Sequence, residues 1–279
     1  MPENREESAV KAANELRPGR MIGAGGTAEV YALDGERILK LFRPSFPKAL
    51  AAQEFENARA VGRCGLPTPE ATALVDYRGR SGIIYRRADG RSILAGMLLP
   101  WKTAGYARLL AALHAQVHLK SAGGLRAYRQ VLARSIRSCG MLTAEEKTAL
   151  CGRLSKLPDG DRLCHGDFHP DNVLLSSGGP VILDWMTACA GDPAADVART
   201  ALILRTAEIP GGLPRLLRLF VERRRQKLHD DYLCEYFRLT GMTRERMDAW
   251  LLPIAAARLV ENRPEKESAR LLAVIRENL

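Results

Sequence analysis

The sequence predicts an α+β protein with a small, β-rich N-terminal lobe at residues 1–88 and a larger, mostly helical C-terminal lobe at residues 89–279. In the first third of the chain, short apolar runs alternate with glycine-containing turns, which is typical of strands joined by hairpins. From about residue 104 onwards, apolar residues recur every three or four positions, as on the buried face of a helix. With 279 residues, the chain is long enough for two such lobes.

A glycine-rich segment joins the first two expected strands, and Gly23, Gly25 and Gly26 are its candidate ligand-binding residues. Backbone amides approach phosphate oxygens closely where no side chain stands in the way. The segment leads from strand to strand, unlike the strand-to-helix turn of dinucleotide-binding folds. Gly-Gly turns also simply join hairpins, so this segment alone does not decide the function. Ala28 stands where the pattern G-x-G-x-x-G has its third glycine, which puts close approach at that point in question.

Lys40 lies in the third expected strand, residues 37–42, and its neighbours on both faces of that strand are apolar. An unpaired ammonium in such surroundings is costly, so Lys40 needs phosphate oxygens or a carboxylate as its partner. The alternative is an edge strand with Lys40 turned to solvent, but two apolar faces argue against it. Lys40 is therefore a candidate nucleotide-binding residue.

The partner carboxylate is expected on the next helix, residues 47–63. Glu54 shares a face of that helix with apolar residues at spacings of three, four and seven, whereas Glu56 lies on a polar face. Glu54 is therefore predicted to point inward and to pair with Lys40.

The remaining elements follow from the same patterns. Further strands are expected at 71–77 and 82–87, a connection between the lobes at 86–90, and helices from about 104 and at 125–138, 143–156, 197–207, 213–238, 244–260 and 265–277. His114 and His118 are four residues apart in the first of these helices, a spacing that suits a metal ion. Because no acidic third ligand accompanies them in the sequence, a role for His114 in the core or at an interface is preferred.

The segment from His165 to Asn172, followed by Asp184, carries the most specific pattern of the chain. Asp167 lies five residues before Asn172, and Asp184 follows twelve residues later, at the end of an apolar run. The catalytic loop of protein kinases, H-x-D-x-x-x-x-N, supplies a carboxylate near the accepting hydroxyl and an Asn for magnesium, and a later Asp also binds magnesium. Asp and Asn also commonly cap turns, but the register of His165, Pro170 and Asp184 favours the catalytic interpretation.

The interval after Asp184 is short. Asp192 follows it after eight positions and is expected to cap a helix that starts at Pro193. Asp196, in the first turn of that helix, either binds backbone amides of the catalytic loop or complements the helix dipole. Protein kinases have a long activation segment in this interval, which docks a peptide substrate. Because this chain has no room for such a segment, the pattern indicates a small acceptor molecule.

The charge and composition of the chain limit the classes of binding partner that the sequence supports. The net charge is +10, but Lys and Arg are spread along the chain, and the one dense run, 223–227, continues a helical pattern. A solvated helix face is therefore preferred to a nucleic-acid site, and part of the charge suits an anionic nucleotide. No apolar run approaches the roughly 20 residues that span a bilayer. Six cysteines without C-x-x-C spacing indicate reduced thiols, and the polar, acidic N-terminus is unlike a secretory signal, so a cytoplasmic protein is expected.

Together, these stretches resemble the aminoglycoside phosphotransferase and choline kinase superfamily, which has the protein-kinase-like bilobal fold. The match extends over about residues 20–205. His169, where protein Ser/Thr kinases usually have Lys, and the lack of Gly after Asp184 are typical of the small-molecule branch.

The resemblance implies ATP-dependent phosphorylation of a hydroxyl group on a small molecule. Asp167 would be the catalytic carboxylate that orients this hydroxyl and takes its proton. Asn172 and Asp184 would bind Mg²⁺, and Lys40, held by Glu54, would bind the α- and β-phosphates of ATP.

Substrates of that superfamily include aminoglycosides, macrolides, choline and homoserine. The basic chain has no concentrated acidic run in its C-terminal part, which argues against a polycationic aminoglycoside. Two other functions stay open: a nucleotide-binding scaffold without catalysis, and a basic RNA-associated module. The presence of Lys40, Asp167, Asn172 and Asp184 argues against the scaffold.

Overall fold

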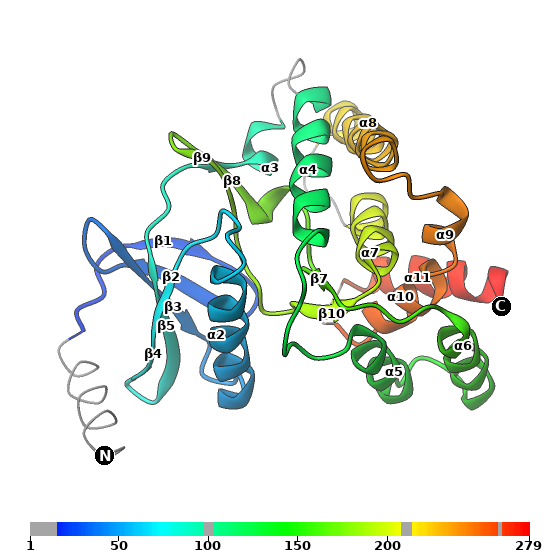
Figure 1. Ribbon diagram of the computed structural model, residues 1–279, viewed down its shortest axis with the longest axis horizontal. Coiled ribbons are helices and arrows are strands. Elements are labelled where there is room, and N and C mark those ends of the chain that lie inside the picture. Colours follow the sequence, from blue (N-terminus) through cyan, green and yellow to red (C-terminus); the bar gives the residue numbers. More distant parts are fainter. Residues whose placement is uncertain (1–15, 98–102, 208–213, 262–263) are drawn as a thin grey trace. The chain divides into compact units, whose positions relative to one another are not determined.

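The computed structural model describes residues 16–97, 103–207, 214–261 and 264–279 (Figure 1). The chain divides into two compact units, the first formed by residues up to Arg91 together with 174–187, the second by 92–173 and 188–279. The acidic N-terminal segment and the expected helix start at residue 213 lie outside the described residues. The predicted α+β class is confirmed, because the first unit contains a five-stranded sheet and the second is mostly helical.

The first unit is built on an antiparallel sheet with the strand order β1-β2-β3-β5-β4. One helix, α2, lies along one face of this sheet (Figure 1). The bounds of these elements are β1 Met21–Ala24, β2 Ala28–Ala32, β3 Arg37–Phe42, α2 Lys48–Gly62, β4 Ala71–Tyr77 and β5 Arg80–Arg86.

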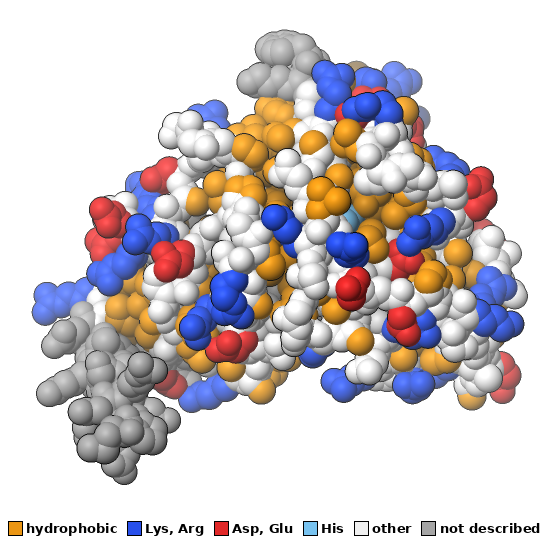
Figure 2. All heavy atoms as spheres, in the orientation of Figure 1, with side chains coloured by type: hydrophobic (Ala, Val, Ile, Leu, Met, Phe, Trp, Pro, Cys, Tyr) orange, Lys and Arg blue, Asp and Glu red, His pale blue; other side chains and the backbone are white. Residues whose placement is uncertain are grey.

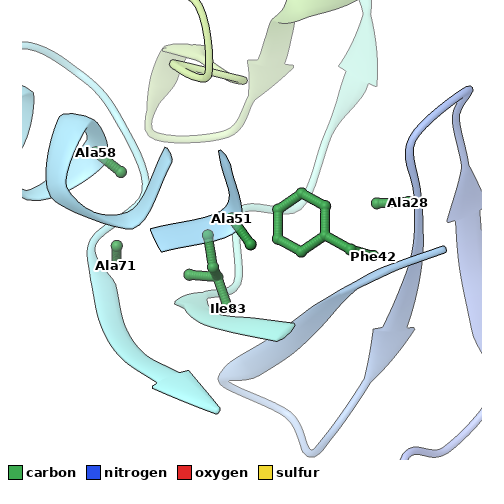
Figure 3. Close-up of a cluster of buried hydrophobic side chains, with 6 residues drawn as sticks. All are labelled: Ala28, Phe42, Ala51, Ala58, Ala71 and Ile83. Carbon is green, nitrogen blue, oxygen red and sulfur yellow. The ribbon is translucent and has the colours of Figure 1, made fainter. Parts of the chain in front are cut away.

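Both faces of the sheet carry apolar cores. Figure 3 shows the cluster on the α2 side, which consists of Ala28, Phe42, Ala51, Ala58, Ala71 and Ile83. On the opposite face lie Leu39, Leu41, Val75 and Ile84. Because side chains alternate along a strand, Lys40 shares the α2 side with Phe42, over whose ring its Nζ lies 5.6 Å from the centroid.

The segment 174–187, expected in the helical lobe, belongs to the first unit instead. Two hydrogen bonds connect it to the loop that follows α2. The Ile182 N–H donates to the carbonyl of Pro67 (2.7 Å), and Trp185 Nε1 donates to Thr68 Oγ1 (2.8 Å). Its strands, β8 Val173–Ser176 and β9 Gly179–Ile182, form a small sheet of order β6-β8-β9 with β6 Arg91–Ser92.

Asn57 is the buried side chain that joins α2 to this segment. Its Nδ2 donates to the carbonyl oxygens of Trp185 and Met186, each at 3.1 Å. Replacing Asn57 with Ala removes a donor from both carbonyls, and we expect the free energy of unfolding to fall by about 1–3 kcal/mol. Urea denaturation followed by circular dichroism measures the change. Glu56→Ala, on the exposed face of α2, is the control, and equal stability of the two variants would contradict the role of Asn57.

The second unit is helical apart from a two-stranded antiparallel ribbon, β7 Arg162–Cys164 with β10 Cys189–Gly191. None of the helices in the described ranges has the length and apolarity needed to cross a membrane. Helix bounds are α3 Ile93–Gly96, α4 Thr103–His118, α5 Tyr128–Ser138, α6 Ala144–Lys156, α7 Pro193–Thr206, α8 Arg215–Thr240, α9 Arg244–Asp248, α10 Leu251–Arg258 and α11 Glu265–Asn278.

The single helix expected at 244–260 is wrong, because the structure has two, α9 and α10. Pro253 explains the break. Proline lacks an N–H and its ring clashes with the carbonyl four residues earlier, so it is tolerated only in the first turn of a helix. The chain therefore starts a new helix at Leu251, two residues before Pro253.

Candidate active site

Within the first unit, Lys40 lies between two carboxylates. Its Nζ is 2.6 Å from Glu54 Oε1 and 3.1 Å from Asp184 Oδ1. The Glu54 side chain is fully buried, and its Oε1 also accepts a hydrogen bond from Tyr85 Oη at 3.1 Å. The structure thus forms the Lys40–Glu54 pair that the helix pattern predicts and brings Asp184 to the same ammonium.

The electrostatics of this triad keep Lys40 charged. Burial alone would lower the pKa of Lys40, but the charges of Asp184 and Glu54 raise it above its ordinary value. Burial raises the pKa of Glu54, although the charge of Lys40 opposes that shift. Lys40 therefore presents a fixed positive charge in a largely buried place, which is the requirement for holding phosphate oxygens.

Asp184 has an unusual backbone conformation. Its φ is +61°, in the left-handed region that few residues other than glycine, Asn and Asp adopt. Such conformations persist only where the surrounding structure fixes them, and they are common at functional sites. Two contacts restrain Asp184. Lys40 binds the Asp184 carboxylate, and Asn57 binds the backbone carbonyls of the two residues that follow Asp184.

The glycine-rich segment is a tight turn between β1 and β2. The Gly25 N–H donates to the carbonyl of Ala28 at 2.8 Å, and the Arg43 guanidinium donates to the carbonyls of Gly25 and Gly26 at 3.0 Å each. Ala28, in place of the third glycine, has its methyl group in the core beside Phe42 (Figure 3). The methyl group is therefore not on the outer surface of the turn.

Gly26→Ala tests close approach to the turn. A Cβ built on Gly26 meets nothing within 4 Å, so the fold should be unaffected. We expect the Kd for ATP to rise about fivefold, as for the loss of roughly 1 kcal/mol of backbone hydrogen bonding. Isothermal titration calorimetry measures the affinity. Gly35→Ala, also with nothing within 4 Å, is the matched control, and equal ATP affinity of the two variants would argue against phosphates at Gly26.

Within the second unit, a loop from β7 to a 3₁₀ turn at Pro170–Asn172 carries Asp167. Asn172 Nδ2 donates to the Asp167 carbonyl at 2.9 Å and lies 3.2 Å from His169 Nε2. The Asp167 N–H donates to His165 Nδ1 at 3.2 Å, and the His165 side chain is fully buried. The structure thus places Asp167 and Asn172 in one loop, with His165 underneath as a brace.

The Asp167 carboxylate lies between two basic side chains. Oδ1 is 3.4 Å from an Arg199 nitrogen, and Oδ2 is 3.4 Å from His169 Nε2. Burial raises the pKa of Asp167, but hydrogen bonding from His169 and the charge of Arg199 outweigh burial and lower the pKa below its ordinary value. Asp167 is therefore ionised throughout the neutral range.

Asp196 fixes the backbone just before Asp167. Its Oδ2 accepts from the His165 N–H at 2.5 Å, and its Oδ1 from the Gly166 N–H at 2.9 Å. Of the two roles that the sequence left open, Asp196 therefore binds the backbone amides of the loop that carries Asp167. Asp192 caps α7 as expected, accepting from the Ala194 N–H at 2.9 Å.

The sequence matches a family model described as phosphotransferase enzyme family over residues 19–229. The chain belongs to this family. No curated protein matches the sequence.

Solved structures share the fold of this phosphotransferase at low sequence identity. A thermostable mutant of aminoglycoside phosphotransferase APH(4)-Ia, in a ternary complex with AMP-PNP and hygromycin B, has a TM-score of 0.64 and 16% identity and covers 99% of this chain and 98% of its own. Aminoglycoside-3′-phosphotransferase of type VIII has a TM-score of 0.63 and 19% identity, and the match covers 90% of this chain and 98% of that protein. Amicoumacin kinase hAmiN, in complex with AMP-PNP, Ca²⁺ and Ami, has a TM-score of 0.61 and 14% identity. The match covers 98% of this chain and 92% of that protein. The predicted protein-kinase-like bilobal fold is confirmed.

The sequence did not reveal that Arg199 lies beside Asp167 and pairs with Glu261. Arg199 is 8% exposed in its side chain and bonds Glu261 Oε1 at 2.6 Å as well as approaching Asp167. Arg199 lies within an apolar run that forms an almost wholly buried helix. An arginine in such surroundings needs a carboxylate partner, so the sequence could have shown that Arg199 has one. The partner, 62 residues further on, could not be read from the pattern.

His114 and His118 lie in the core of the second unit, as preferred for His114 from the sequence. The expectation that no acidic group accompanies them is wrong. Asp196 Oδ2 lies 3.1 Å from His114 Nε2 and 3.3 Å from His118 Nε2. Asp196 is remote in sequence, so only the packing of α7 on α4 brings it to the two rings.

In each unit, taken by itself, the donor groups have the chemistry that a nucleotide with Mg²⁺ needs. Asn172 donates an amide N–H to the Asp167 carbonyl within the loop, so the amide oxygen is its group for a metal ion. Asp184 offers a carboxylate whose side chain is 35% exposed. Carboxylate and amide oxygens are hard ligands of the kind that Mg²⁺ prefers, and the ammonium of Lys40 suits phosphate oxygens.

Proposed function

We propose that this phosphotransferase transfers the γ-phosphoryl group of ATP, with Mg²⁺, to a hydroxyl group of a small molecule. The observation that carries the proposal is Asp167, an ionised carboxylate in a loop whose backbone is held by Asp196 and Asn172. A carboxylate held in this way is suited to accept a hydrogen bond from an acceptor hydroxyl.

Asp167 would orient the acceptor and receive its proton late in the reaction. Its low pKa makes it a weak base, so the proton moves only as the acceptor oxygen begins to bond to phosphorus. The new bond joins the acceptor oxygen to the γ-phosphorus. The bond from that phosphorus to the β–γ bridging oxygen breaks, and ADP leaves with the electron pair.

The remaining residues would bind the nucleotide. Lys40, held by Glu54, would contact the α- and β-phosphates, and the glycine-rich turn would offer backbone amides. Asn172 and Asp184 would bind Mg²⁺. When bound, Mg²⁺ neutralises charge on the phosphate oxygens.

The chain that follows Asp184 supports a small acceptor. The strand β10 starts at Cys189, five residues after Asp184, and the helix cap Asp192 follows directly after that strand. The residues between Asp184 and β10 are too few to form a docking segment for a peptide.

The charges beside Asp167 support an acceptor other than a polycation. Glu261 is already paired with Arg199 at 2.6 Å and lies 3.7 Å from an Arg258 nitrogen. A carboxylate neutralised by two arginines attracts an ammonium group weakly. With the net charge of +10, this favours a neutral or anionic hydroxyl compound over an aminoglycoside.

A screen of ADP release tests the proposal. Purified protein with Mg-ATP is given amino alcohols, sugars, hydroxy acids and antibiotics in turn, and the Asp167→Asn protein serves as the blank. We expect ADP formation that depends on one acceptor class and on Mg²⁺, and at least about a hundredfold slower formation in the blank. A wild-type protein that does not bind Mg-ATP in calorimetry would contradict the proposal.

An RNA-associated module is the competing function suggested by the net charge. Figure 2 shows Lys and Arg side chains scattered over the visible face, with Asp and Glu among them, and no single basic stripe. Charges of both signs that are scattered in this way are typical of an ordinary solvent-exposed surface rather than of a nucleic-acid-binding site. Tight RNA binding that weakens steeply with salt would favour the competing function.

A further inference from the structure

We propose that His114 and His118, each set in one ring tautomer by a tyrosine, are positioning residues that hold Asp196 and, through it, the backbone of the catalytic loop. The role in catalysis rests on the phosphotransfer proposed above, whereas the hydrogen-bond network is a property of the fold.

The network centres on one oxygen atom. Asp196 Oδ2 lies 3.1 Å from His114 Nε2 and 3.3 Å from His118 Nε2, and it also accepts from the His165 N–H at 2.5 Å. The second oxygen, Oδ1, accepts from the Gly166 N–H. The carboxylate thus joins two rings on α4 to the two peptide groups that precede Asp167.

The other nitrogen of each ring contacts a tyrosine. His114 Nδ1 lies 2.7 Å from Tyr232 Oη, and His118 Nδ1 lies 2.6 Å from Tyr236 Oη. Both pairs are spaced by four residues, one helical turn, so the histidines of α4 and the tyrosines of α8 match one to one. Helix α8 packs against both α4 and α7 in the second unit (Figure 1).

Each proton in this network has one favourable place. Burial opposes ionisation of Asp196, but its interactions with the two rings keep its pKa well below the ordinary value, so it is a pure acceptor. Each Nε2 must then carry a hydrogen. Burial lowers the pKa of His114 to about 3, so this ring is neutral and its Nδ1 can only accept.

The tyrosines supply the matching donors. Burial raises the pKa of both Tyr232 and Tyr236, so each keeps its O–H. The O–H donates to Nδ1, and the ring N–H donates to Asp196. The reversed tautomer would turn the Nε2 lone pair of a ring toward the carboxylate oxygen, which is unfavourable.

His114 also contacts the catalytic loop directly. Its ring stacks on Phe168, the residue after Asp167, with the centroids 4.2 Å apart. Gly166, the residue before Asp167, has φ +76°, a conformation that its held N–H helps to fix. A change in the position of the rings would therefore displace both neighbours of Asp167, Gly166 and Phe168.

A metal ion is the competing explanation of this cluster. The three ligand atoms lie within 4.8 Å of one another, and two histidines four residues apart are a common metal-binding pair. However, hydrogen bonds already engage every ring nitrogen and both carboxylate oxygens. We therefore favour the hydrogen-bonded network and make metal content an outcome of the test.

Three tyrosine-to-phenylalanine variants of the full chain test the proposal. Tyr232→Phe and Tyr236→Phe remove the donors, and Tyr128→Phe is the control, because its buried hydroxyl has no hydrogen-bond partner in the described part of the chain. The first measurement is ¹⁵N NMR of histidine-labelled protein, which reports which ring nitrogen carries hydrogen. The second is hydrogen exchange of the His165 and Gly166 amides.

In the wild type and in Tyr128→Phe, we expect the Nε2–H tautomer for His114 and His118 and slow exchange of both amides. In Tyr232→Phe and Tyr236→Phe, the ring that loses its donor should show mixed tautomers and the two amides should exchange at least about tenfold faster. With an acceptor identified, kcat should fall about ten- to hundredfold while KM for ATP stays the same.

The proposal is overturned if the wild type has Nδ1–H rings, if mass spectrometry finds one tightly bound metal ion per chain, or if amide exchange is the same in all variants. Tautomers and exchange need no acceptor, so this test stands apart from the proposed function. A protein that lacks phosphotransfer but shows the expected tautomers would contradict only the function.

Discussion

In the Asp167→Asn protein, kcat is expected to fall by about 10²–10⁴-fold, the usual range for removing a positioned base. The amide can still contact the acceptor hydroxyl but cannot take up its proton. Mg-ATP binding should be nearly intact, because Lys40, Glu54 and Asp184 are unchanged. Steady-state ADP release measures the loss, and calorimetry measures the affinity for ATP.

Asp171→Asn is the matched control for this prediction. Asp171 lies in the same loop, its side chain is exposed, and it has the same chemistry. We expect its kcat to equal that of the wild type. Full turnover by Asp167→Asn, or an equal loss in both variants, would remove Asp167 from the catalytic role.

Asp184→Asn is expected to lower kcat/KM at least about a hundredfold, because a neutral amide holds Mg²⁺ on the phosphates far less well than a carboxylate. The fold should be retained, since Asn tolerates the positive φ at this position. Asp184→Ala should be equally inactive and also less stable by about 1 kcal/mol, because a methyl group is strained at this φ. Activity against Mg²⁺ concentration and thermal unfolding separate the two effects.

Asp89→Asn, an exposed aspartate of the same unit, is the control for the loss of one carboxylate. Its activity and its Mg²⁺ dependence should match the wild type. An Asp184→Asn protein that keeps the wild-type Mg²⁺ dependence would show that Asp184 is not a ligand.

The parts that could be predicted from the sequence are those set by neighbours along the chain. The inward face of Glu54 follows from residues within two helical turns, and the strand before Asp184 follows from a short apolar run. Pro253 is likewise a local signal, because proline is tolerated only in the first turn of a helix. Local patterns state which face of an element is buried.

Local patterns do not state which partner meets that face. His114 and Tyr232 are 118 residues apart, and each alone is an ordinary polar residue on a helix. The sequence indicates that Asp196 lies near the loop, but its two histidine partners follow only from the tertiary structure, which brings α7 to α4. The assignment of 174–187 to the first unit depends in the same way on remote hydrogen bonds.

The helix α2 positions two parts of the proposed nucleotide-binding residues at once. Glu54 holds Lys40, and Asn57, one turn later on the same side of the helix, holds the carbonyls that follow Asp184. A rotation of α2 by a single residue, about 100°, would withdraw both side chains together. One helix therefore positions both the Lys40 ammonium and the Asp184 carboxylate, so a displacement of α2 would disturb the two groups together.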